Sequence, residues 1–134
     1  MNKIKLACLS SLLVAGIAHA GNSCDKFDIV LVNKTGLTLA GSANIGPNAE
    51  ITPSIITGFE DQQTFTITAP TEGNLTGKFS LASISVPLKQ AVIHYSLANE
   101  ALGVCGHKMT TIEGDYSVTD SRSPNKVTYT IAPK

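Results

Sequence analysis

The chain has 134 residues, too few for two ordinary domains once a targeting segment is set aside. Its ten Lys and Arg residues balance ten Asp and Glu residues and are scattered, which excludes the basic footprint of a nucleic-acid-binding protein. No segment reaches 18 consecutive apolar residues, so a transmembrane helix is excluded as well.

Residues 1–20 have the pattern of a secretory signal peptide. Lys3 and Lys5 precede an apolar run over residues 6–17, and Ala18-His19-Ala20 places small residues at both positions that determine cleavage. We therefore expect cleavage after Ala20 and export to the periplasm or beyond. The mature part, residues 21–134, is expected to form a single domain with a formal charge near minus two, because removing two lysines leaves eight basic residues against ten acidic ones.

Two cysteines remain after cleavage, because Cys8 lies within the signal peptide. In an oxidising compartment paired thiols are the default, so we expect a disulfide between Cys24 and Cys105. Closing a loop of that length is worth about 4 to 5 kcal/mol in the chain-entropy model. The alternative is a pair of free or metal-binding thiols.

A period of two dominates the apolar pattern along the chain. In residues 64–69, Phe65 and Ile67 share one face and three threonines share the other, and residues 126–131 repeat the alternation around Tyr129. Similar runs make nine expected strands, in chain order residues 27–32, 37–42, 50–56, 64–69, 78–86, 91–97, 104–112, 116–120 and 126–131.

Short turn-forming segments rich in Gly, Pro and Asn separate these runs. Eight or nine short strands with this spacing predict an all-β protein, an antiparallel β-sandwich closed by one disulfide. The residues expected in its core are Phe27 or Ile29, Phe65, Ile67, Phe79, Leu81, Ile93, Tyr95, Val127, Tyr129 and Ile131.

Two segments allow more than one interpretation. In residues 78–86 the apolar phase changes between Leu81 and Ile84, which indicates either a β-bulge near Ala82 and Ser83 or two separate strands. Helical periodicity is weak throughout, and residues 97–102 are the one short candidate for a helical turn.

The mature chain carries two histidines, and neither indicates a catalytic or metal centre. The alternation places His94 on the face opposite Ile93 and Tyr95, where a histidine is usually a solvated surface residue. His107 lies in Cys105-Gly106-His107-Lys108-Met109, whose soft donors would suit copper. Because the expected disulfide uses the thiol, two donors would remain, too few for a closed site. We expect no metal and no cofactor.

Nucleophilic or acid-base catalysis also lacks a complete set of residues. There is no Gly-x-Ser-x-Gly elbow, and the carboxylates at Glu60-Asp61 and at Glu113 and Asp115 lie in polar, turn-like segments typical of solvated surface. The chain is therefore not expected to be an enzyme, and a small secreted hydrolase is kept as an alternative.

Binding is expected on loops. Residues 43–49 and 70–77 are the longest connections containing Gly, Asn and Pro, and exposed loops are where binding residues are commonly placed. If the strands alternate up and down, both loops could lie at one end of the sandwich. The candidate binding residues are Asn44, Asn48, Asn74 and Leu75.

The segment Glu72-Gly73-Asn74-Leu75-Thr76-Gly77-Lys78-Phe79-Ser80-Leu81, followed by Val92-Ile93-His94-Tyr95, resembles the aegerolysin family. That resemblance implies a compact β-sandwich that binds membrane lipids, sometimes with a pore-forming partner, although this chain lacks the family's tryptophans. Taken together, we expect an exported, non-catalytic binding or host-interaction protein with an unknown protein or membrane-lipid partner. A lipid-binding, cytolysin-like module is the main alternative.

Overall fold

A computed structural model describes residues 23–70, 73–100 and 103–134. The expected signal peptide lies outside the described residues. Within them the chain forms ten strands. They are β1 Phe27–Asn33, β2 Leu39–Gly46, β3 Glu50–Thr52, β4 Ile55–Phe59, β5 Gln62–Thr68, β6 Leu75–Ser83, β7 Gln90–Glu100, β8 Val104–Gly114, β9 Tyr116–Ser123 and β10 Lys126–Pro133.

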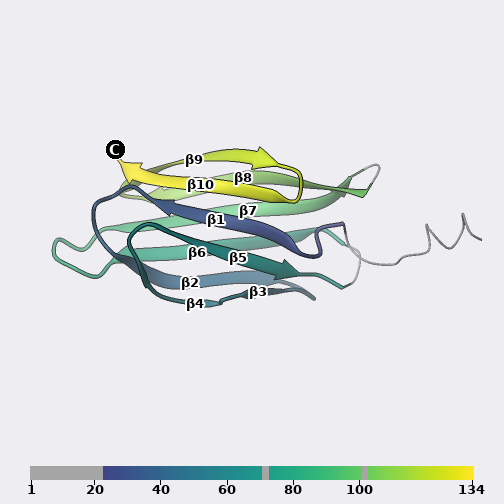
Figure 1. The fold of residues 1–134 in the computed structure, drawn as a ribbon, viewed down its shortest axis with the longest axis horizontal. Helices are drawn as coiled ribbons and strands as arrows, with labels where there is room; N and C mark the ends of the chain where they lie inside the picture. The colour runs from purple at the N-terminus through teal and green to yellow at the C-terminus, as the bar shows by residue number, and fades with distance from the viewer. Residues whose placement is uncertain (1–22, 71–72, 101–102) are drawn as a thin grey trace, which may run out of the picture.

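The strands form two five-stranded sheets packed as a sandwich, which confirms the predicted all-β sandwich (Figure 1). The described residues form ten strands rather than the expected eight or nine, because the run over residues 50–56 is divided between two strands. One sheet has the order β3-β5-β1-β10-β9 and the other the order β4-β2-β6-β7-β8. Neighbouring strands are antiparallel with one exception. β1 and β10 run parallel, with Asp28 opposite Lys126 and Asn33 opposite Ile131, so the first strand occupies the centre of its sheet.

The core lies between the inward faces of the two sheets, where alternate residues of each strand meet. Every predicted core residue is buried, with at most 3% of its surface exposed. Phe79 is central, because its ring contacts Phe65 of the opposite sheet edge-on at 5.0 Å and lies 5.5 Å from the ring of Tyr95. The period-two pattern therefore identified the inward face of the main strands correctly.

Two local expectations were wrong. Residues 50–56 form two strands in different sheets, because Pro53 interrupts the run and the chain crosses from β3 to β4 there. Residues 78–86 contain neither a bulge nor a second strand, since β6 keeps a regular register with β2 and β7 and ends at Ser83. The described part of the candidate helical turn, residues 97–100, is the end of β7.

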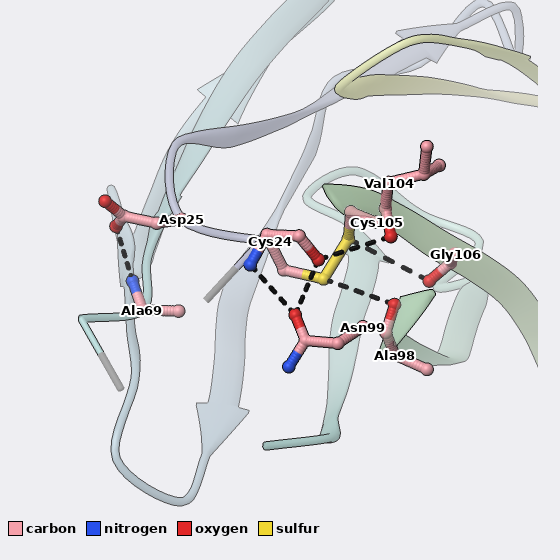
Figure 2. Close-up of a disulfide and its surroundings, with 9 residues drawn as sticks. Cys24, Asp25, Ala69, Ala98, Asn99, Val104, Cys105 and Gly106 are labelled. Atoms are coloured by element: carbon pink, nitrogen blue, oxygen red, sulfur yellow. Dashed lines mark hydrogen bonds between the residues drawn. A yellow bond between two sulfur atoms is a disulfide. The ribbon is translucent and has the colours of Figure 1, made fainter. Parts of the chain in front are cut away.

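The predicted disulfide joins Cys24, just before β1, to Cys105 on β8 and so links the two sheets. Figure 2 shows its surroundings. The side-chain oxygen of Asn99 on β7 accepts a hydrogen bond from the Ser23 amide at 2.8 Å, and the Asp25 carboxylate accepts one from the Ala69 amide at 2.8 Å. The segment before β1 is thus tied to both sheets.

Candidate functional site

An open groove lies along the edge where the chain changes sheets. Residues 43–45 of β2 form one side, and residues 50–55, which include β3 and the start of β4, form the other. The volume of the groove is about 630 Å³. Ala43 donates its amide to the carbonyl oxygen of Ser54 at 2.8 Å, so both sides are held by backbone contacts rather than by mobile side chains.

A second depression of about 440 Å³ adjoins the groove at the end of the sandwich. It is lined by Asn48, Ala49, Glu50, Thr68 and Pro70. Asn48 has a positive φ of 63°, a conformation that Asn tolerates well, and this lets the chain turn sharply between β2 and β3. Glu50 lines both depressions, so the two hollows meet at this exposed residue.

The two loops expected to bind lie at the same end of the sandwich, as register shows. Gly46 at the end of β2 pairs with Thr76 near the start of β6, and Glu50 pairs with Thr68 at the end of β5. Both loops are shorter than expected, because residues 43–46 belong to β2 and residues 75–77 belong to β6.

The four candidate binding residues divide into three groups. Asn44, exposed on β2, lines the groove, and Asn48 lines the second depression. Asn74 is exposed but lines neither hollow in the part of the chain that the structure describes. The expectation that Leu75 is an exposed loop residue is wrong, because Leu75 begins β6 and is only 4% exposed in the core. Glu50 was not among the candidates, because it begins a run that was predicted to be a strand and binding residues were sought on loops.

Leu75 and Asn74 give a direct test of this correction. Leu75→Ala should lower the free energy of unfolding by about 2 kcal/mol, because it removes buried methyl groups and leaves a cavity. Asn74→Gly, on the neighbouring exposed residue, should change it by less than about 0.5 kcal/mol. Urea unfolding of both variants measures the difference, and equal stabilities would contradict the buried position of Leu75.

A buried polar cluster occupies the side of the sandwich where β8 and β9 approach each other. His107 of β8 is hydrogen-bonded through Nε2 to the hydroxyl of Tyr129 on β10. Its Nδ1 lies 3.9 Å from a carboxylate oxygen of Asp120 on β9 and makes no hydrogen bond. Burial, aided by Arg122, lowers the pKa of His107 to about 4 despite the opposing effect of Asp120, so the ring is neutral at pH 7.

His107 and Tyr129 of this cluster are closed to solvent, whereas Asp120 is partly exposed. Tyr129 is fully buried, the His107 side chain is 1% exposed, and burial raises the pKa of the Tyr129 hydroxyl further above its usual value. In this conformation the Tyr129 hydroxyl is therefore out of reach of solvent. Because Cys105 and His107 are two residues apart and both point inward, the alternation around the disulfide could have revealed this burial.

The remaining polar candidates lie on the surface. His94 is outward, as predicted, and its Nε2 lies 2.9 Å from a carboxylate oxygen of Glu113 on the next strand. Glu60 and Asp61 are exposed between β4 and β5, and Glu60 accepts a hydrogen bond from the Thr38 hydroxyl at 2.9 Å. Exposed pairs of this kind contribute little to stability.

The residues that the structure describes contain no group of three or more His, Cys, Asp or Glu side chains placed to hold a metal ion. No helix among them has the length and apolar character needed to cross a membrane.

No protein-family model, curated protein or solved structure matches this chain. The resemblance to the aegerolysin family therefore stays an interpretation of short sequence motifs.

Proposed function

We propose that the protein is an exported, non-catalytic binding module whose ligand occupies the groove and the adjoining depression around Glu50. The observation that carries this proposal is that the two hollows share Glu50 as a lining residue and also include Asn44 and Asn48. Ligand sites are typically concave, with a few polar groups set in an apolar lining. The disulfide between Cys24 and Cys105 supports export, since such bonds persist in oxidising compartments.

The chemistry of the lining restricts the ligand. Asn44 and Asn48 each offer an amide donor and an amide acceptor, and the Glu50 carboxylate accepts hydrogen bonds and disfavours an anion. Ile45, Pro53 and the exposed Ile55 contribute apolar surface beside them. The groove therefore suits a neutral or cationic ligand that has hydrogen-bond donors on one side and an apolar edge, such as a glycan or an extended peptide segment.

Glycan and peptide arrays probed with labelled protein test this proposal. The double variant Asn44→Ala/Glu50→Gln should lose at least about tenfold of the wild-type signal, because two polar contacts are removed from an otherwise unchanged surface. Glu60→Gln, an equally conservative change at the opposite end, is the matched control and should bind normally. Signals that persist in the double variant, or no wild-type signal on either array, would contradict the assignment.

The alternative, a small secreted hydrolase, is tested by measuring substrate turnover. Turnover of any substrate in a panel for esterase, glycosidase and peptidase activity would favour the enzyme class. Assays of the His107→Gln and Glu50→Gln variants with the same substrates would then identify the side chain on which turnover depends.

A further inference from the structure

The connection between β6 and β7, residues 84–89, exposes a set of aliphatic side chains that no interaction inside the protein explains. Ile84 is 65% exposed, Val86 94% and Leu88 66%. These residues, with Ser85, Pro87 and Lys89, are called the apolar loop below. Large aliphatic side chains concentrated at one protruding point are unusual on a soluble domain and mark contact sites.

The structure holds the apolar loop in this conformation. Ser83, only 1% exposed at the end of β6, directs its hydroxyl toward the carbonyl oxygens of Ser85 and Pro87, at 3.3 and 3.2 Å. The same hydroxyl accepts a hydrogen bond from the Lys89 amide at 2.9 Å. The Ile84 amide donates to the carbonyl oxygen of Thr38 at 3.1 Å. The loop is thus preorganised, and inserting its tip into an apolar medium would cost little additional ordering.

Figure 1 shows the apolar loop at the left, where it extends beyond the other described connections at that end of the sandwich. Its neighbours there are the β1–β2, β4–β5 and β8–β9 connections. Thr38 contacts Ile84, Glu60 accepts a bond from Thr38, and the Asp115 amide donates to the carbonyl oxygen of Gln90 at 2.7 Å. The apolar tip is therefore convex and surrounded by polar turns set further back.

The composition of this end indicates the kind of partner. The tip contains aliphatic residues and none of the Trp, Tyr or Arg residues that usually anchor protein interfaces. The surrounding charges nearly cancel, so attraction to an anionic surface is not expected. They are Lys34, Lys89 and Lys134 against Glu60, Asp61, Glu113 and Asp115.

We propose that the apolar loop inserts Ile84, Val86 and Leu88 into the interface of a zwitterionic phosphocholine bilayer. A convex aliphatic tip fits a deformable apolar medium, and a nearly neutral rim avoids repulsion from lipid headgroups of either sign. This surface lies at the end of the sandwich opposite the Glu50 groove, so the inference does not depend on the proposed ligand site. Insertion would leave that groove facing away from the membrane.

Co-sedimentation with phosphocholine vesicles tests the proposal. The variant Ile84→Ser/Val86→Ser/Leu88→Ser should lose at least about tenfold of the wild-type partition coefficient, because it removes the inserting methyl groups. Val104→Ser is the matched control, since Val104 is 51% exposed at the start of β8, outside both the apolar loop and the groove, and should bind within about twofold of wild type. Circular dichroism checks that each variant is folded.

Two further measurements separate insertion from electrostatic adsorption. Binding should change by less than about twofold when phosphatidylserine is added or when salt is raised to about 0.5 M, because the rim is nearly neutral. A polarity-sensitive dye on Val86→Cys should shift to the blue on vesicles, whereas the dye on Ile55→Cys should not. Failure of the wild type to bind phosphocholine vesicles, or unchanged binding of the triple serine variant, would overturn the proposal. Binding that requires anionic lipid or disappears in salt would also overturn it.

Discussion

Replacing both Cys24 and Cys105 with alanine should lower the free energy of unfolding by about 4 to 5 kcal/mol, the largest single effect that the structure predicts. The bond closes a loop between residues 81 positions apart, so its loss releases a large amount of conformational freedom in the unfolded chain. Both cysteines are buried, and the segment around Cys24 connects the two sheets. The native state therefore also loses an anchor.

Guanidinium unfolding of the double variant beside the wild type measures this loss. Wild-type protein treated with a reductant is the control, and its stability should fall to that of the alanine variant. A difference below about 1 kcal/mol would show that Asn99 and Asp25 hold the segment before β1 without the disulfide.

Acidification should destabilise the protein through His107. The pKa of this residue is about 4 in the folded protein and near 6.5 in the unfolded chain, so the unfolded state takes up the proton first as the pH falls. The contribution to stability is complete above about pH 6.5, declines as the pH falls and is fully lost near pH 4. The loss is about 3 kcal/mol, since each pKa unit corresponds to about 1.4 kcal/mol.

Denaturant unfolding at pH 7 and at pH 4 isolates this effect when a variant is compared with the wild type. His107→Gln lowers stability at pH 7 but removes the ionisable ring, so its loss between the two pH values should be about 3 kcal/mol smaller than that of the wild type. His94→Gln, which changes the exposed histidine, is the control and should keep the full loss. The same pH dependence in both variants would show that other groups govern acid unfolding.

Much of the fold could be predicted from the sequence because alternation carries the information. Residues such as Phe65 and Tyr129 lie within runs in which every second side chain is apolar, and one face of those runs is the core. The Cys24–Cys105 pair was predictable for a different reason, since two cysteines allow only one intramolecular pairing.

Strand ends and the choice of sheet could not be predicted in the same way. Ile84 and Val86 extend the apolar pattern past Ser83, but hydrogen bonds from Ser83 turn the backbone out into the apolar loop. Ile51 and Ile56 both point inward from the same run, and only tertiary structure shows that Pro53 separates them into two sheets. Periodicity reports which face is buried and not which strand lies beside it.

The residues of the candidate site could also be predicted only in part from the sequence. Asn44 and Asn48 were both expected on a loop, but Asn44 lies on β2 and only Asn48 lies in the connection to β3; both line the hollows around Glu50. Leu75 was misassigned because turn-forming neighbours concealed its position as the first core residue of β6. The alternation around Cys105 could have indicated that His107 is buried, but its hydrogen bond to Tyr129, a residue 22 positions away, is a contact that local pattern does not contain.

The parallel pairing of β1 with β10 determines when the chain can complete its fold. β1 lies at the centre of its sheet, yet its partner strand β10 is made roughly 100 residues later, so that sheet cannot close until β10 has been made. Contacts between such distant segments form slowly, because the intervening chain must be ordered first. An emerging chain of this design therefore stays incompletely folded for longer than a chain whose sheets pair only strands that are neighbours in sequence.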